Sequence, residues 1–172
     1  TYRSHVIFSD DSGKTWKLGG VLGEKTNECQ AVELSEGTVM INMRSYHGKN
    51  RRAVATSKDG GETWSEVRLD EALIEPVCQA SLIRMDRKGD PKVVLLFSNP
   101  AGTKREKLTI RASTDEGSSW PHAHDLRAGP AAYSSLVVLP DGGIGCLYER
   151  GEKSPYEKIT FARFSYDWLT GK

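Results

Sequence analysis

Short stretches in which apolar and polar residues alternate, separated by turns rich in glycine, asparagine and aspartate, follow one another along almost the whole chain. A period of two over such short stretches predicts β-strands joined by hairpins. No stretch shows a helical pattern, so we predict an all-β chain. The expected strands are His5–Phe8, Trp16–Leu18, Glu28–Leu34, Thr38–Ser45, Arg51–Ser57, Trp64–Leu69, Cys78–Met85, Lys92–Ser98, Lys107–Ser113, one starting at Trp120, Ala132–Leu139, Gly145–Arg150 and Ile159–Ser165.

An eight-residue turn with the pattern Ser-x-Asp-x-Gly-x-Thr/Ser-Trp occurs three times, at residues 9–16, 57–64 and 113–120. Its aspartate and serine can hydrogen-bond to nearby backbone, its glycine permits a positive φ, and its tryptophan begins the next strand with an apolar anchor. The copies lie about fifty residues apart, the length of one four-stranded propeller blade with its loops. Calcium or sugar binding is the alternative role, but each turn lacks the dense oxygen ligands of a calcium loop. We therefore expect these turns to pin hairpins.

Composition and charge narrow the possible partners. The 24 basic and 23 acidic residues nearly cancel, so the charge indicates neither nucleic acid nor an anionic membrane surface as a partner. No apolar run approaches the length of a membrane-spanning helix, and no signal peptide opens the chain. The chain starts at Thr1, and we expect an upstream segment to have been removed.

Residue types that bind metals are sparse. Cys29, Cys78 and Cys146 have no metal-like spacing, and we expect them to be buried free thiols. Three histidines lie in polar loops without a matching set of ligands, which favours a surface role. We expect neither a metal nor a cofactor.

The alternating strand directions sort polar residues between the two ends of each blade. If the strands of a blade run outward from the axis as A, B, C and D, then the start of A, the end of B and the start of C share one end, and the repeated turns lie at the other. The residues sorted to the first end are Glu28, Arg44, Arg105, Tyr133 and Glu149. Each is ordinary on a protein surface, but their convergence near the axis indicates a site.

The chemistry of this group suits an anionic ligand. Two arginines at the mouth of a propeller favour a carboxylate, because each guanidinium offers paired donors in a planar fork. A phenol with a pKa near ~10 becomes a useful nucleophile only when a neighbouring carboxylate, here Glu28 beside Tyr133, takes its proton. A neutral nucleophile also avoids the repulsion that an acidic one would meet from an anionic substrate.

The repeated turn resembles the Asp box, or bacterial neuraminidase repeat, of sialidases and other β-propellers. Over essentially the whole chain, five further motifs resemble the exo-α-sialidase (neuraminidase) family in order and spacing. They are Asn27-Glu28-Cys29-Gln30, Asn42-Met43-Arg44, Ser98-Asn99-Pro100 leading to Arg105, Ala132-Tyr133-Ser134-Ser135-Leu136 and Gly145-Cys146-Leu147-Tyr148-Glu149.

The resemblance implies a six-bladed β-propeller and a role for each of the five converging residues. It implies Tyr133 as the nucleophile and Glu28 as its general base. It implies Arg44 and Arg105 as the second and third of three arginines that bind the carboxylate of sialic acid. Glu149 would be the acid that orients the first arginine.

Four other positions bear on the site. Arg111 is the alternative to Arg105, and we prefer Arg105 because Arg111 lies inside a strand and could simply face solvent. In the middle blade, Cys78, Gln79 and Asn99 occupy positions equivalent to site residues, so we expect them to line the pocket.

The chain also departs from the family. It has no Arg-Ile-Pro motif for the first arginine, and the acid/base aspartate of the family lies upstream of the first Asp box. About thirteen strands are expected, in successive groups of two, four, four and three that each belong to one blade. Six four-stranded blades contain about twenty-four, so residues 1–172 resemble the C-terminal half of a single propeller domain. Its terminal blades would expose apolar faces, and we expect either the missing N-terminal half or a second copy to cover them.

The function that the resemblance implies is that of a retaining exo-α-sialidase, which hydrolyses terminal sialic acid from glycoconjugates through a tyrosyl-enzyme intermediate. We expect this fragment alone to be inactive. The alternative is a non-catalytic Asp-box propeller that binds glycans or proteins, and the pair of Glu28 and Tyr133 argues against it. A trans-sialidase uses the same residues and differs in its acceptor site. A sialylated glycan is the expected substrate, which is consistent with a secreted or periplasmic protein.

Overall fold

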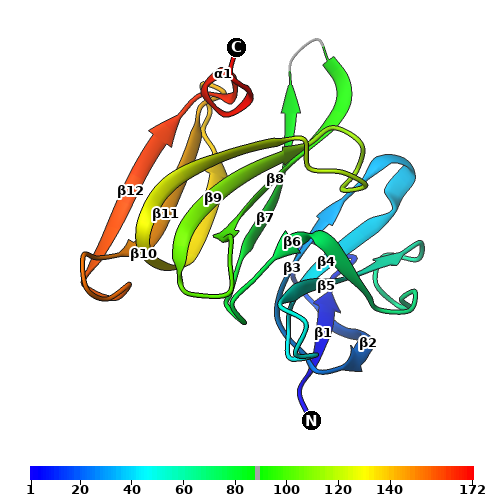
Figure 1. Cartoon of the computed structure of the whole chain (residues 1–172). Coiled ribbons are helices and arrows are strands. Elements are labelled where there is room, and N and C mark those ends of the chain that lie inside the picture. The colour runs from blue at the N-terminus through cyan, green and yellow to red at the C-terminus, as the bar shows by residue number, and fades with distance from the viewer. Residues whose placement is uncertain (88–89) are drawn as a thin grey trace.

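The computed structural model describes residues 1–87 and 90–172, and for residues 90 and 91 it describes the backbone only. Within these ranges the chain is all-β, as predicted, apart from one short α-helix and one 3-10 turn (Figure 1). The strands are β1 Arg3–Phe8, β2 Lys17–Glu24, β3 Thr26–Glu33, β4 Val39–Ser45, β5 Arg51–Ser57, β6 Arg68–Ile74, β7 Ser81–Arg87, β8 Asp90–Pro100, β9 Glu106–Ser113, β10 His122–Val138, β11 Ile144–Arg150 and β12 Lys158–Phe164.

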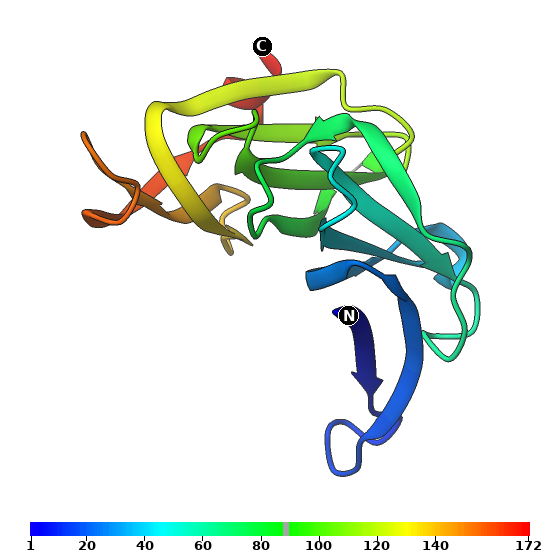
Figure 2. The same cartoon turned by 60° about the horizontal axis from the view of Figure 1, so that its bottom comes forward.

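The strands form three antiparallel sheets that follow one another around an arc (Figures 1 and 2). Strands β1 and β2 form a hairpin, and β3 to β6 form a four-stranded sheet in chain order. Strands β7 to β12 form the third sheet, also in chain order. The first two groups therefore match the predicted two-stranded and four-stranded groups.

The predicted boundary between the last two groups was wrong, because the long strand β10 connects them. Its first half pairs with β9 and its second half with β11. Register shifts at residues 125–127, 127–130 and 131–134 bend the strand without ending it. Pro130 is tolerated inside the strand because it lies at one of these shifts. Figure 2 shows β10 running along one part of the sheet and turning into the next.

The helix was also missed by the sequence analysis. Helix α1 comprises Tyr166–Thr170, with the Ser165 side chain accepting a hydrogen bond from the Trp168 backbone and Gly171 in the left-handed conformation after its last turn. A helix of one turn has no periodic pattern to detect, and only these two caps mark its ends in the sequence.

Three apolar clusters hold the arc together, two between successive sheets and one within the last sheet. Leu22 of the hairpin packs with residues of the next sheet such as Ile41. Val32 and Met40 of that sheet pack with residues of the third sheet, including Phe97. The third cluster lies between the β8–β9 part and the β10–β12 part of the last sheet, covered by α1. Each sheet therefore buries its faces against its neighbours, as stacked blades do.

The three Asp boxes, at residues 9–16, 57–64 and 113–120, fold alike and pin hairpins, as predicted. In each box the serine Oγ accepts a hydrogen bond from the glycine backbone at 2.8 Å, and that glycine has a positive φ. The aspartate accepts from the backbone and the hydroxyl of the residue before the tryptophan. These hydrogen bonds hold the pKa of Asp11 and Asp59 at about 2. The box aspartates are thus saturated by their own turns.

The tryptophans of the boxes do not begin strands, which corrects the prediction. Trp16, Trp64 and Trp120 each precede the next strand by one or more residues. Trp64 still packs in the cluster between the hairpin and the second sheet, and Trp120 packs on Phe97 with ring centroids 5.7 Å apart. Trp64 and Trp120 therefore anchor their turns from outside the strand ladders, whereas Trp16 is 60% exposed.

Candidate active site

Three of the predicted site residues meet in one hydrogen-bonded group, although they come from three strands of two sheets. Tyr133 in β10 donates its hydroxyl proton to Glu28 Oε1 in β3, across 2.7 Å. Arg44 in β4 donates from Nη1 to Glu28 Oε2 at 2.8 Å and to the Tyr133 hydroxyl at 3.2 Å. The convergence predicted from strand direction is therefore confirmed for these three.

Irregular strand pairing positions both acidic and phenolic side chains. Glu28 lies where the β3–β4 register shifts between Thr26 and Cys29. Tyr133 lies where the β10–β11 register shifts between Ala131 and Ser134. Such bulges re-aim side chains, and here they turn Glu28 and Tyr133 toward each other.

Arg105 lies over the ring of the Tyr133 phenol. Its guanidinium carbon is 5.7 Å from the centre of the Tyr133 ring. Nη1 donates to the hydroxyl of Tyr156 at 2.6 Å, and Nη2 donates to the backbone oxygen of Val77 at 3.4 Å. Arg111 instead donates to Asn99 Oδ1 at 2.9 Å and is half-buried, so the prediction that it faces solvent is wrong. The geometry favours Arg105.

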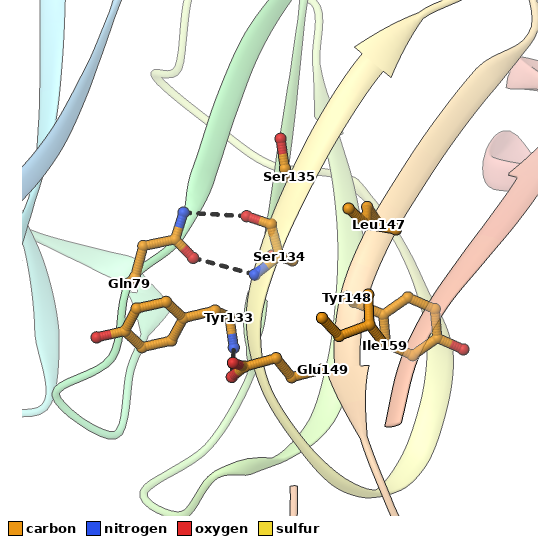
Figure 3. A pocket seen from close by; sticks show the side chains of 8 residues that line it. All are labelled: Gln79, Tyr133, Ser134, Ser135, Leu147, Tyr148, Glu149 and Ile159. Atoms are coloured by element: carbon orange, nitrogen blue, oxygen red, sulfur yellow. Dashed lines mark hydrogen bonds between the residues drawn. The ribbon is translucent and has the colours of Figure 1, made fainter. Parts of the chain in front are cut away.

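Glu149 joins the site through the backbone of the tyrosine. Its Oε2 accepts a hydrogen bond from the Tyr133 backbone N–H at 3.1 Å (Figure 3). This contact comes from β11, the strand next to the one that carries the phenol. Whether Glu149 also orients an arginine is not tested by the residues described, so that role stays a prediction.

Gln79 lines the pocket beside Tyr133, as predicted. Its side-chain amide pairs with the backbone of Ser134 in both directions, accepting from N–H and donating to C=O at 3.0 Å each (Figure 3). The Gln79 side chain thus makes the same two hydrogen bonds as the backbone of a paired strand would, and it fixes the backbone next to Tyr133. The pocket has a volume of about 280 Å³ and is lined by Gln79, Tyr133, Ser134, Ser135, Leu147, Tyr148, Glu149 and Ile159.

Other sequence expectations need correction. Cys78 and Asn99 are fully buried, so they lie beneath the site and do not line it. Cys29 is exposed, because it alternates outward in β3 next to the inward Glu28, whereas Cys78 and Cys146 are buried as expected. Burial raises the pKa of the Cys78 thiol to about 11 and that of Cys146 to about 12. Both therefore stay protonated at neutral pH.

The electrostatics keep Glu28 charged and Tyr133 neutral. Burial alone would raise the pKa of Glu28, but hydrogen bonds from Arg44 and Tyr133 and the positive charges of Arg44 and Arg52 hold it below its ordinary value. The hydrogen bond to Glu28, burial and the charge of Glu28 raise the pKa of Tyr133, and only Arg44 opposes them appreciably. A carboxylate base is therefore paired with a phenol that still holds its proton.

A buried ion pair beneath the site escaped the sequence analysis. Arg52 and Glu75, with side chains 1% and 0% exposed, meet at 2.6 Å. The available signal was weak: Arg52 precedes three small or apolar residues in its strand, and Glu75 follows a short apolar run. Tyr156, the hydroxyl partner of Arg105, was also missed because it lies in a polar loop.

In residues 1–87 and 90–172, no group of three or more histidine, cysteine, aspartate or glutamate side chains is arranged to hold a metal ion. The same residues contain no helix long and apolar enough to span a membrane.

Comparison with known proteins gives consistent results. The family model of the BNR repeat-like domain matches residues 1–146. A sialidase of Micromonospora viridifaciens is 41% identical over 175 residues, which cover 99% of this chain and 26% of that protein. A sialidase of Bacteroides fragilis is 40% identical over 151 residues, which cover 84% of this chain and 28% of that protein. The chain thus spans about a quarter of the length of these relatives.

The solved structures point the same way. The structure of the Hadza microbial sialidase Hz136 matches with a TM-score of 0.84 and 39% identity, over 95% of this chain and 32% of that one. The stacked antiparallel sheets, the three Asp boxes and these matches over nearly the whole chain agree. The chain therefore belongs to the sialidase family with BNR repeats.

Proposed function

We propose that this chain is the C-terminal half of the catalytic propeller domain of an exo-α-sialidase, which hydrolyses terminal sialic acid from glycoconjugates with retention of configuration. The observation that carries the proposal is the 2.7 Å hydrogen bond from the Tyr133 hydroxyl to Glu28, with Arg44 touching both groups. A protein that only binds glycans has no need for a base paired with a phenol.

In the first step, the Tyr133 oxygen attacks the anomeric carbon of sialic acid while Glu28 takes the phenolic proton. The glycosidic bond breaks and the leaving oxygen is protonated by an acid outside this chain. Arg44 and Arg105 hold the substrate carboxylate, since Arg44 contacts the hydroxyl of the phenol and Arg105 lies over its ring. Water then attacks the anomeric carbon and gives a proton to the same group outside this chain. The bond between the Tyr133 oxygen and the anomeric carbon breaks, Glu28 returns the proton to the phenolate, and sialic acid leaves. Two displacements on one carbon give net retention.

A charged base and a neutral nucleophile suit this substrate. The lowered pKa of Glu28 keeps it ready to accept a proton at neutral pH, and the raised pKa of Tyr133 keeps the phenol uncharged until it reacts. A sialoside carries its negative charge next to the reacting carbon. An uncharged oxygen can approach that carbon without the repulsion that a carboxylate nucleophile would meet.

The rest of the site is proposed to come from the remainder of a six-bladed propeller. Support comes from the two outer faces of the arc, which expose large apolar side chains. On the β1–β2 hairpin these include Ile7 and Leu18, and on the β11–β12 end they include Leu147, Ile159 and Phe161. Further blades, or a second copy of this chain, would cover these faces and add the leaving-group acid and a first carboxylate-binding arginine.

The test is release of fluorophore from a 4-methylumbelliferyl sialoside. The whole protein that carries this chain should be active, and Tyr133→Phe should lower its kcat/KM by about 10²–10⁴-fold, because the nucleophile is gone. Tyr166→Phe in α1 is the matched control and should keep activity. NMR should show the α-anomer as the first product. A whole protein that hydrolyses no sialoside would instead indicate a glycan-binding propeller.

This chain by itself should be silent in the same assay, since the acid for the leaving group lies elsewhere. Activity of the isolated chain at the level of the whole protein would contradict the proposed division of the site.

A further inference from the structure

The buried ion pair of Arg52 and Glu75 lies directly beneath the candidate carboxylate-binding arginines. Burial raises the pKa of Glu75, and the positive charge of Arg52 is the main effect that opposes this rise. Buried ion pairs stabilise a fold little compared with apolar residues of the same volume, because both charges lose their water. The contacts that the pair makes with the backbone point to a different role.

On one side the pair holds the end of β4, where Arg44 lies. Glu75 Oε1 accepts a hydrogen bond from the backbone N–H of Ser45 at 2.7 Å. Arg52 Nε donates to Asn42 Oδ1 at 2.7 Å. Ser45, which follows Arg44, and Asn42, two residues before it, are therefore both held by the same ion pair.

On the other side the pair holds the turn that contacts Arg105. Arg52 Nη1 donates to the backbone oxygen of Cys78 at 2.8 Å. The preceding residue, Val77, has a φ of 54°, which is strained for a β-branched side chain. The backbone oxygen of this strained residue accepts the hydrogen bond from Arg105. The ion pair thus helps to hold the turn in the conformation that presents this oxygen.

We propose that the ion pair of Arg52 and Glu75 is a positioning device that sets the spacing of Arg44 and Arg105 for a substrate carboxylate. Arg44 lies in β4 and Arg105 in the loop before β9. Tyr133 contacts both arginines, and the ion pair connects the two backbone segments that hold them. The inference rests on the proposed function, because the carboxylate is that of the sialoside. Arg52 and Glu75 themselves touch neither substrate nor reacting atoms.

The experiment replaces both charges together, so that no charge is left buried alone. In the whole protein, R52M/E75L should stay folded. Its KM for the 4-methylumbelliferyl sialoside should rise by about 10- to 100-fold with a smaller change in kcat, because misplaced arginines weaken carboxylate binding. Inhibition by free sialic acid should weaken in parallel, whereas inhibition by its methyl ester, which lacks the negative charge, should not change.

The matched control is R84M/D86L. Arg84 pairs with Asp86 at 2.7 Å and donates to the backbone oxygens of Glu33 and Leu34, so it also links two sheets. This pair lies at the opposite end of β3 from Glu28. It should leave KM and the inhibition by both ligands unchanged.

The outcomes separate the two proposals. A parent protein that hydrolyses no sialoside removes the proposed function. An active parent whose folded R52M/E75L variant keeps KM and sialic acid inhibition overturns the positioning role alone. If R52M/E75L does not fold, Val77→Gly decides: it relaxes the strained turn with the pair intact. A several-fold rise in the KM of this variant for the sialoside, with unchanged inhibition by the methyl ester, supports the positioning role. An unchanged KM overturns it.

Discussion

The two ends of the strands carry polar groups that are built in opposite ways. Each Asp box closes on itself: its aspartate and serine bond to partners no more than four residues away, with nearly the same distances in all three copies. At the other end, the hydrogen bond between Tyr133 and Glu28 joins residues 105 apart in sequence. A local turn can be repeated in every blade, whereas the site exists only where two particular sheets stack.

The carboxylates at the two ends differ in whether a hydrogen-bond partner can give up its proton. Asp59 is surrounded by a serine hydroxyl, a threonine hydroxyl and backbone N–H groups, all neutral donors that keep their protons. Glu28 is held by Arg44 and by the acidic proton of a phenol. The pKa of both carboxyl groups is lowered, but only Glu28 has a partner that can give up its proton in a reaction.

The largest expected effect comes from removing the charge of Glu28. Glu28→Gln in the whole protein should lower kcat/KM for a sialoside by about 10²–10⁴-fold, the usual contribution of a general base. The hydrogen bond and charge of Glu28 raise the pKa of Tyr133, so this pKa should fall in the variant. Ring ¹³C NMR, with Tyr133→Phe for assignment, measures it.

The control for this substitution lies at the opposite end. Asp59→Asn removes the same charge from an Asp box and should leave kcat/KM unchanged. Full activity in Glu28→Gln, or a Tyr133 pKa that rises, would show that the pair is not a nucleophile with its base.

Removing Arg44 should have a smaller effect with a distinct pH signature. Arg44→Met should raise KM by about 10- to 100-fold, since a charge-assisted pair with the substrate carboxylate is lost. The hydrogen bond and charge of Arg44 hold the pKa of Glu28 down, so its loss should raise that pKa. The base then becomes protonated at a higher pH, and the acidic limb of the pH profile of kcat/KM should shift to higher pH. An acidic limb that stays at the same pH would show that Arg44 does not lower the pKa of Glu28.

The contrast between the two ends also explains what could be predicted from the sequence. The Asp boxes were readable because eight consecutive residues contain every partner. Tyr133, Glu28 and Arg44 could be sorted to one end from strand direction alone, since antiparallel pairing fixes which strand ends meet. The bend of β10 was missed because the turn signal of Gly129 and Pro130 also fits a bulge. Arg52 and Glu75 were missed because nothing local shows that two charged residues share a buried space.

A still smaller effect is expected from opening one Asp box. Ser57 is buried, and Ser57→Ala would leave the Gly61 N–H without its 2.8 Å acceptor. We expect a loss of about 1–2 kcal/mol in the free energy of unfolding, the cost of one unsatisfied buried donor. KM should not change, because the box lies at the other end of the strands. Urea denaturation measures the loss, with exposed Ser118→Ala as the control. A changed KM with unchanged stability would place the boxes in the site.

The smallest expected effect is a change in the pH dependence of stability, visible only at acidic pH. The pKa of Asp59 is about 2 in the folded protein against 3.8 for a free aspartate, because the turn donates hydrogen bonds only to the charged form. A lowered folded pKa stabilises the fold above the unfolded value, and this contribution is lost as the pH falls from about 4 toward about 2. In Asp59→Asn that dependence is absent, so the urea midpoint should fall less steeply over this range than in the parent. Lys58→Gln, in the same turn, should keep the parental slope. Equal slopes in all three proteins would mean that the box does not distinguish a charged aspartate from a neutral one.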